Sequence, residues 1–304
     1  MGHSDLRIMV TGAAGLLGLR LTTLLLDKFH VIAVTHEHDF PGSITAKLQT
    51  VKCDLTDRVS VSRLVHDFEP DVVINSAAMT DVDACEEKQI LASKVNCDIV
   101  AHLIDAIKHD KTRFVQISTD YLFDGRNGPY PEEAVPNPLN VYGRTKLAAE
   151  QLVSKFNGES LIVRTSALFD NEDHGKANLF TAVYGRLKSG ESVKVASDLY
   201  CNPIWTLNLS AAILEAVEQG LAGIMNIAGS QYLSRYDFAL SMAHEYRFPR
   251  QLVQAVPLAS LNRKAVRPLK AGVDVTKASK LLHTKLLSPA EAFTRIDFIG
   301  HGKN

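Results

Sequence analysis

A tyrosine and a lysine four residues apart, Tyr142 and Lys146, are the residues of this sequence best suited to proton transfer. They lie in a segment predicted to form a helix beginning near Val141, where side chains at positions i and i+4 share one face. Because a nearby ammonium group favours the phenolate, we expect the lysine to lower the pKa of Tyr142 from its usual value of about 10. Such a phenol could exchange a proton near neutral pH, and the lysine could also bind the ribose of a cofactor.

A residue with a hydroxyl group precedes this helix at the end of a predicted strand. Thr119 follows the apolar run Arg113–Ser118, and its hydroxyl could form a hydrogen bond with a substrate carbonyl oxygen. A positioned general acid, the role predicted for Tyr142, accelerates proton transfer to a reacting group by about 10²–10⁴-fold. The Tyr-x-x-x-Lys pattern alone often occurs by chance on a solvent-exposed helix. We nevertheless predict that Thr119, Tyr142 and Lys146 are catalytic, because a glycine-rich turn accompanies them.

Three glycines, Gly12, Gly15 and Gly18, lie between the first predicted strand and the first predicted helix. Their G-x-x-G-x-x-G spacing is a variant of the dinucleotide-binding fingerprint. Gly12 would allow a tight exit from the strand, Gly15 would let backbone N–H groups approach a pyrophosphate, and Gly18 would permit close packing of the helix on the strand. The turn therefore predicts a dinucleotide site formed by Gly12, Ala14, Gly15, Leu16, Leu17 and Gly18.

The ends of the following strands supply further candidate cofactor contacts. An acidic residue at the end of the second strand would bind the ribose hydroxyls of NAD(H) and repel the extra phosphate of NADP(H). Thr35 and His36 occupy that place, with Glu37 one step further along. We therefore favour NADP(H), with NAD(H) as the alternative. The remaining predicted cofactor contacts are small or polar residues at the third and fourth strand ends together with the helical pair: Asp54, Leu55, Ala77, Ala78, Tyr142 and Lys146.

Apolar runs alternate with amphipathic segments through the first half of the chain, as in a parallel sheet covered by helices. Beyond about residue 165 the pattern is less regular. We therefore predict an α/β fold, with a Rossmann-type doubly wound parallel sheet over residues 1–165. Residues 166–304 would form a smaller α/β substrate-binding domain, some of whose segments return to the sheet. Strands are expected over 6–10, 31–35, 48–53, 71–75, 113–118 and 161–164, and helices over 16–28, 59–68, 90–108, 207–218, 236–246 and 289–298, with one more from 141.

The composition disfavours several classes of protein. The 304 residues are 46% hydrophobic, enough to bury a core without disulfides. Thirty-three basic and 34 acidic residues give a net charge of −1, whereas a nucleic-acid or membrane-surface protein would carry a basic surplus. The four cysteines lack metal-ligand spacing, and no stretch has the layout of a signal peptide or a membrane span. We expect a cytoplasmic protein without a metal site, with a homodimer as its candidate assembly.

Several segments together resemble the extended short-chain dehydrogenase/reductase superfamily and, within it, the dTDP-4-dehydrorhamnose reductases. The resemblance spans nearly the whole chain. It implies that nicotinamide hydride reduces a 4-keto group on a nucleotide-linked sugar. The matching segments are Ser-Thr-Asp-Tyr-Leu-Phe at 118–123, Pro-Leu-Asn-Val-Tyr-Gly-Arg-Thr-Lys-Leu-Ala at 138–148, Arg-Thr-Ser at 164–166, Asp198 with Pro203, Arg267-Pro268, and Asp-Val-Thr-Lys at 274–277.

The resemblance also implies roles for individual residues. Tyr142 would protonate the nascent alkoxide, and Lys146 would tune the tyrosine and bind ribose. Thr119 would hold the carbonyl group of the substrate. Asp120 and Tyr121 would border the sugar.

Three further residues bear on the substrate. The segment from 263 to 285 is rich in Lys and Arg, whose side chains pair well with phosphate. Among them the resemblance implies Arg267 as the residue that binds the substrate diphosphate, because it lies in the matching Arg-Pro segment. Ala167 stands where these reductases usually carry a tryptophan that stacks on the sugar. The only tryptophan, Trp205, is expected in the core. The nucleotide base and the sugar are therefore left open.

Two other functions fit the same residues. The same branch includes the regulatory beta subunit of methionine adenosyltransferase, which keeps the cofactor fold while serving a partner enzyme, and the loss of the tryptophan at Ala167 motivates this alternative. An epimerase or dehydratase of the superfamily is the other, although a dehydratase is expected to carry a Glu where Tyr121 follows Asp120. The intact set of Thr119 and the helical pair favours a reductase acting on a small-molecule nucleotide sugar.

Overall fold

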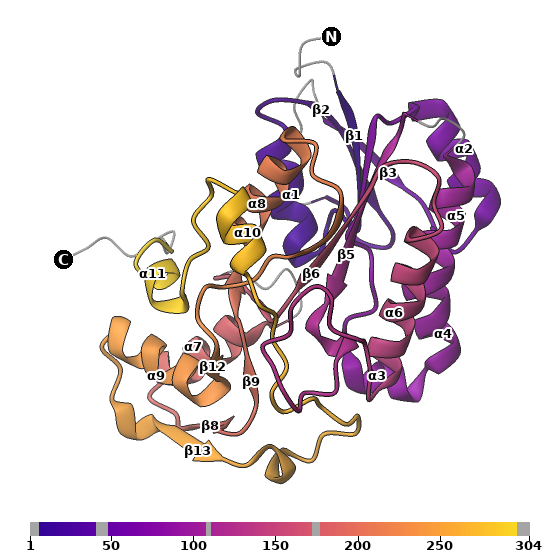
Figure 1. Ribbon diagram of the computed structural model, residues 1–304. Helices are drawn as coiled ribbons and strands as arrows, with labels where there is room; N and C mark the ends of the chain where they lie inside the picture. Colours follow the sequence, from indigo (N-terminus) through magenta and orange to yellow (C-terminus); the bar gives the residue numbers. More distant parts are fainter. Residues whose placement is uncertain (1–5, 41–47, 108–110, 172–176, 297–304) are drawn as a thin grey trace.

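A seven-stranded sheet forms the centre of the computed structural model, which describes residues 6–40, 48–107, 111–171 and 177–296 (Figure 1). Its strand pairs are all parallel, in the order β11-β6-β5-β4-β1-β2-β3. The order reverses direction between β1 and β4, so the predicted doubly wound α/β fold is confirmed. The strands are β1 (Arg7–Thr11), β2 (His30–Thr35), β3 (Leu48–Lys52), β4 (Val72–Asn75), β5 (Arg113–Thr119), β6 (Ser160–Thr165) and β11 (Gly223–Asn226).

Helices cover both faces of this sheet, because its central strands are apolar on both sides (Figure 1). On one face α1 packs against α8, and Leu21 and Ile213 are buried between them and the strands. On the other face Val65, Leu103 and Val153 are buried in the same way by α2, α5 and α6. In chain order these helices are α1 (Leu16–Leu25), α2 (Arg58–Phe68), α3 (Val82–Glu87), α4 (Gln89–Ser93), α5 (Ile99–Ala106), α6 (Val141–Val153) and α8 (Thr206–Glu218).

The prediction of one continuous helix over 90–108 is wrong, because a π-helical turn at Lys94–Asp98 separates α4 from α5. Residue 108, the last of the predicted helix, lies outside the described ranges. This turn carries the buried Asn96. The Oδ1 of Asn96 accepts a hydrogen bond from Met79 N (2.8 Å), and its Nδ2 donates one to Thr145 Oγ1 (3.0 Å). Turns of this kind often occur at functional sites. Here the wider turn lets one amide join the loop after β4 to helix α6.

The second lobe has an aromatic core of its own. Phe169, Phe180, Phe238 and Phe293 are buried there, with neighbouring ring centroids 5.2–6.4 Å apart. Trp205 packs against this cluster. The lobe comprises the helices α7 (Leu179–Lys188), α9 (Arg235–Glu245) and α11 (Pro289–Phe293), and three strand pairs: β7 (Leu168–Phe169) with β10 (Ile204–Trp205), β9 (Tyr200–Cys201) with β12 (Leu233–Ser234), and β8 (Val193–Ala196) with β13 (Val253–Val256).

Segments from the second half of the chain return to the main sheet. Strand β11 pairs with β6, α10 (Thr276–Leu281) lies against β11, and α8 lies against α1. The predicted boundary after residue 165 coincides with the end of β6. Helix α11 ends at Phe293, and the residues from 297 onward, like 172–176, lie outside the described ranges. No helix within the described ranges has the length and the apolar content to cross a membrane.

Candidate active site

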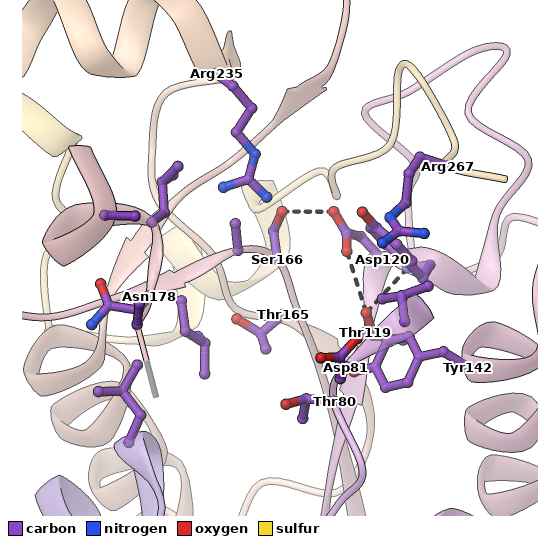
Figure 2. A pocket seen from close by; sticks show the side chains of 18 of the residues that line it. Thr80, Asp81, Thr119, Asp120, Tyr142, Thr165, Ser166, Asn178, Arg235 and Arg267 are labelled. Atoms are coloured by element: carbon purple, nitrogen blue, oxygen red, sulfur yellow. Dashed lines mark hydrogen bonds between the residues drawn. The ribbon is translucent and has the colours of Figure 1, made fainter. Parts of the chain in front are cut away.

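A cavity of about 930 Å³ lies between the carboxyl ends of the sheet strands and the second lobe. Residues that follow β1, β4, β5 and β6 line one side of it, and residues of α7, β8 and α9 line the other. Strands β1 and β4 flank the point at which the strand order reverses, where doubly wound sheets bind their ligands. Figure 2 shows Thr119, Asp120 and Tyr142 on the sheet side, with Arg235 and Asn178 across the cavity.

The glycine-rich turn forms one end of this cavity. Gly12 has a φ of +64°, and a Cβ there would lie 2.8 Å from the backbone of Ala77. A Cβ on Gly18 would collide with the carbonyl oxygen of Gly12. The N-cap residue Gly15 offers no side-chain hydrogen bond, and the first turn of α1 contains no acidic residue. The positive end of this helix therefore stays available to an anion, so the turn fits the pyrophosphate of a dinucleotide.

The structure places the predicted cofactor residues in two groups. Gly12, Gly15, Leu16, Leu17, Gly18 and Ala78 line the cavity, together with the helical pair from α6. The others lie beyond its wall, at the ends of neighbouring strands or in the turn: Ala14, Thr35, His36, Asp54, Leu55 and Ala77.

The ends of β2 and β3 adjoin each other, since Cys53 N donates a hydrogen bond to Thr35 O (2.9 Å). Thr35 is buried, whereas the His36 side chain is 63% exposed and therefore free to meet a ligand. The Asp54 carboxylate accepts hydrogen bonds from the backbone and the hydroxyl of Thr56, and these bonds lower its pKa. At the end of β2, the place predicted for the extra phosphate of NADP(H), the exposed side chains are His36 and the neighbouring Glu37.

Helix α6 delivers Tyr142 and Lys146 to the cavity. Asn140 caps the helix by accepting a hydrogen bond from Gly143 N (2.8 Å). A side chain at Gly143 would collide with the Tyr121 carbonyl oxygen, so this glycine lets the helix approach the end of β5. As a result the rings of Tyr121 and Tyr142 meet edge to face, with centroids 5.9 Å apart.

Burial governs the protonation of this pair. Lys146 is 3% exposed, its Nζ donates a hydrogen bond to Ile117 O (2.6 Å), and burial lowers its pKa to about 8. The expectation that the pKa of Tyr142 lies below its usual value is wrong for the protein alone. Burial raises that pKa well above the usual value, and hydrogen bonding with Thr119 opposes the rise only partly. Tyr142 therefore carries its proton at neutral pH and is suited to donate it.

Asp120 anchors the wall beside Thr119. It is buried, which raises its pKa, although hydrogen bonds from Ser166 Oγ (2.6 Å) and Gly272 N (3.1 Å) to its Oδ2 act in the opposite direction. Its Oδ1 accepts a weaker hydrogen bond from Thr119 Oγ1 (3.3 Å). Both oxygens are thus engaged in joining three chain segments. Tyr121, predicted to border the sugar, also lines the cavity, and burial raises its pKa to about 12.

Arg267, predicted to bind the substrate diphosphate, lines the cavity, but it already has an acidic partner. Its Nη1 donates hydrogen bonds to Asp83 Oδ1 (2.9 Å) and to Ala265 O (2.9 Å). The same Asp83 oxygen accepts a hydrogen bond from Ala265 N (2.9 Å). These bonds fix the guanidinium group at the edge of the cavity, and sequence reasoning did not foresee this neutralising carboxylate.

Other cavity residues were missed from the sequence. Arg235, from the first turn of α9, points into the cavity (Figure 2). The buried hydroxyls of Ser118 and Thr165 also line it and have no hydrogen-bond partner among the described residues. Thr165 lies opposite Thr119 in the register of β5 and β6. Of these three residues, only Ser118 and Thr165 could have been identified from the sequence, because each lies at a strand end within the segments around Thr119 and Arg164.

The described residues contain no group of three or more His, Cys, Asp or Glu side chains placed to hold a metal ion.

The chain is similar along most of its length to a family of reductases. The model of the RmlD substrate binding domain matches residues 6–296. A dTDP-4-dehydrorhamnose reductase from Aggregatibacter actinomycetemcomitans is 31% identical over 286 residues, which cover 89% of this chain and 91% of that protein. A crystal structure of a hypothetical dTDP-4-dehydrorhamnose reductase from Sulfolobus tokodaii is 37% identical, with a TM-score of 0.83, and covers 93% of this chain and 97% of its own.

Two further similarities bear on cofactor and function. The structure of dTDP-4-dehydrorhamnose reductase from Bacillus anthracis in complex with NADP has the same fold, with a TM-score of 0.84 at 24% identity over 96% of this chain and 98% of its own. Methionine adenosyltransferase 2 subunit beta from Pongo abelii is 26% identical over 90% of this chain and 82% of its own. The similarity thus extends to reductases and to a subunit of a different enzyme.

Proposed function

The chain belongs to the RmlD substrate binding domain family, and from this premise we propose that it is an NADPH-dependent reductase of a 4-keto deoxysugar linked to dTDP. One observation carries the proposal. The cavity wall brings together the hydroxyl of Thr119, the protonated phenol of Tyr142 and the ammonium group of Lys146, and a glycine turn fitted to a pyrophosphate closes the same cavity. A carbonyl reductase that uses a dinucleotide needs these groups in one place.

Each residue has a role that its surroundings support. Bound NADPH would supply the hydride, which adds to the carbonyl carbon while the C=O π electrons move to oxygen. The Thr119 hydroxyl holds that oxygen, and Tyr142 donates its proton to it, which leaves an alcohol on the sugar and a phenolate on the enzyme. The ammonium group of Lys146 stabilises the phenolate and binds the cofactor ribose. Solvent then returns the proton to Tyr142.

NADP(H) is the favoured cofactor for two reasons. Strand β2 ends at the buried Thr35 rather than at an acidic residue, and the exposed His36 follows it, with a carboxylate oxygen of Glu37 4.0 Å from its Nδ1. A protonated His36 would attract the extra phosphate, and the reductase from Bacillus anthracis that shares the fold was solved with NADP. NAD(H) is the weaker alternative, and the ratio of kcat/KM for the two cofactors decides between them.

The test is a turnover assay with the purified protein, NADPH and dTDP-4-dehydrorhamnose, followed by the loss of reduced-nicotinamide absorbance and by chromatography of the sugar nucleotide. We expect stoichiometric formation of NADP⁺ and of the alcohol product. Thr119→Val should slow turnover by about 10²-fold or more, because the substrate oxygen loses its hydroxyl partner. Thr50→Val, the same change at an exposed position of β3, is the control. Binding of both ligands without turnover would refute the proposal.

The same assay separates the alternatives. A regulatory subunit is supported by the similarity to the methionine adenosyltransferase subunit and would bind NADPH without consuming it. An epimerase or dehydratase would convert the sugar nucleotide without net oxidation of NADPH. Tyr121, an edge-to-face neighbour of Tyr142, occupies the place where a dehydratase would need an acid.

We further propose that the protein acts in the cytoplasm as a homodimer. Its four cysteines are free thiols, as in proteins of reducing compartments. Light scattering of the purified protein would test the assembly, and fractionation of cells would test the location.

A further inference from the structure

The cavity carries an excess of positive charge at its walls. Six cationic side chains line it within the described ranges, against three carboxylates. The glycine turn of α1 already accounts for one anion, the pyrophosphate of the cofactor. Lys146 comes from α6, whereas the other five cations lie on the second lobe and on the loop around Arg267, so those five are placed for an anion carried by a second molecule. The six cationic side chains are Lys146, Arg186, Lys194, Arg235, Arg263 and Arg267.

Three of these cations are already engaged with groups of the protein. The guanidinium group of Arg267 pairs with Asp83 (2.9 Å), and that of Arg186 lies 3.7 Å from a carboxylate oxygen of Glu191. Lys146 donates to a backbone carbonyl. Of the others, Lys194 and Arg263 are exposed to solvent, which hydrates them. Arg235 is the exception that needs an explanation.

Arg235 is half-buried, and no described residue offers its side chain a hydrogen bond or an ion pair. Its backbone is nevertheless firmly held. The preceding Ser234 and the following Asp237 form a capping box at the start of α9, and Arg235 N donates a hydrogen bond to Leu199 O (2.9 Å). The side chain points from this fixed base into the cavity, above Ser166 and Asp120 (Figure 2). A partly desolvated guanidinium group is stabilised by an anion, and the part of the chain that the structure describes supplies none in direct contact.

The charges of Arg235 and Arg267 act on the same side chain, Tyr121. Both guanidinium groups act to lower the pKa of Tyr121, and Arg235 also acts to lower the pKa of Asp120, although burial outweighs them in each case. Arg235 comes from the second lobe and Arg267 from the loop that contacts α3, yet the charges of both act on the Tyr121 hydroxyl. An anion bound beside Tyr121 would therefore meet one cation already neutralised by Asp83 and one that is free.

We propose that Arg235 binds the diphosphate of the nucleotide-linked substrate, together with Arg267. This inference rests on the proposed function, since it takes the second molecule in the cavity to be a nucleoside diphosphate sugar. The planar guanidinium fork matches two phosphate oxygens, which a point charge cannot do equally well. Arg235 thus supplies the unneutralised positive charge, and Arg267, oriented by Asp83, supplies a second set of donors.

The test measures binding rather than turnover. Titration calorimetry gives the Kd of dTDP, of a dTDP-sugar and of NADPH for the wild type and for Arg235→Gln, Arg235→Lys and Arg250→Gln. The last variant removes one positive charge from an exposed position of the same lobe that does not line the cavity, and serves as the control. Loss of charged hydrogen bonds to phosphate should weaken dTDP binding by about 10- to 100-fold in Arg235→Gln. The Kd of Arg235→Lys for dTDP should lie between those of the wild type and Arg235→Gln. The dTDP affinity of Arg250→Gln, and the NADPH affinity of every variant, should equal those of the wild type.

Three results would overturn the inference. The first is unchanged dTDP affinity in Arg235→Gln. The second is a loss confined to the dTDP-sugar, which would place Arg235 at the sugar instead. The third is a wild type that does not bind dTDP. If Arg235→Gln fails to fold, the lysine variant, which keeps the charge but not the fork, decides the question. Arg235-dependent dTDP binding without keto-sugar reduction would refute the proposed reductase alone, and reduction unaffected in Arg235→Gln would refute this inference alone.

Discussion

The pH dependence of the rate should report the ionisation of Lys146. Its Nζ is buried, and burial lowers its pKa to about 8, whereas the pKa of Tyr142 is raised. The ammonium form stabilises the phenolate left when Tyr142 gives up its proton, and the neutral amine does not. We therefore expect the rate of keto reduction to fall as the pH rises through about 8, with the tyrosine still protonated in that range.

The size of the effect follows from the pKa. A group of pKa about 8 is roughly 91% charged at pH 7 and roughly 9% charged at pH 9, so kcat/KM, which reports ionisations of the ligand-free enzyme, should drop about tenfold between these values. Folding stability changes in the opposite direction. The unfolded chain, with a lysine pKa of about 10.4, binds more protons between about pH 8 and pH 10, so this group's contribution to stability rises with pH. Loss of activity above pH 8 would therefore not reflect unfolding through Lys146.

The assay is the pH profile of kcat/KM for the wild type, Lys146→Arg and Lys155→Arg. A guanidinium group keeps its charge throughout the range, so Lys146→Arg should lose the alkaline decline, at a lower overall rate because the longer side chain must fit a buried site. The exposed Lys155, at the end of the same helix, is the matched control and should keep the wild-type profile. A wild-type rate that is flat to pH 10, or a decline near pH 8 that persists in Lys146→Arg, would refute the reasoning.

Tyr142→Phe should lower kcat about 10²- to 10⁴-fold while fluorescence titration shows unchanged NADPH affinity, because only the proton donor is lost; a loss below tenfold would contradict its role. Gly18→Ala should weaken NADPH binding at least tenfold, because the new Cβ collides with the Gly12 carbonyl and displaces the turn. An unchanged Kd for NADPH would argue against the glycine-rich turn as the site of the pyrophosphate. Glu150→Gln leaves the guanidinium of Arg164 buried without its carboxylate and should lower the free energy of unfolding by about 3–5 kcal/mol in denaturant titrations, whereas a change below about 1 kcal/mol would show that the pair is dispensable.

Much of the fold and of the candidate site could be predicted from patterns within short segments of the sequence. The apolar runs that end at Thr11, Asn75 and Thr119 were recognisable as buried strands because a parallel sheet covered on both faces needs continuous apolar segments. The helix of Tyr142 follows from spacing, and the glycine turn follows from the steric demands of a strand that turns directly into a helix. These features depend on residues close together in the chain.

Other features depended on partners far away in the chain. The π-helical turn around Asn96 is favoured by hydrogen bonds to Met79 and Thr145, and the spacing of apolar residues alone predicted an uninterrupted helix there. The pairing of Arg267 with Asp83 joins residues 184 positions apart. No property of either segment marks the other as its partner.

The sequence by itself determined most of the alternation of strands and helices over residues 1–165, the glycine turn, and the presence of a tyrosine, a lysine and a threonine predicted to act on a carbonyl group, because each of these depends on residue types at a few neighbouring positions. Only the tertiary structure decided that burial raises the pKa of Tyr142, that Arg267 is neutralised by Asp83, and that Arg235 reaches the cavity without a partner among the described residues. Desolvation and ion pairing depend on what covers a side chain in space, and a linear sequence does not contain that information in a locally readable form.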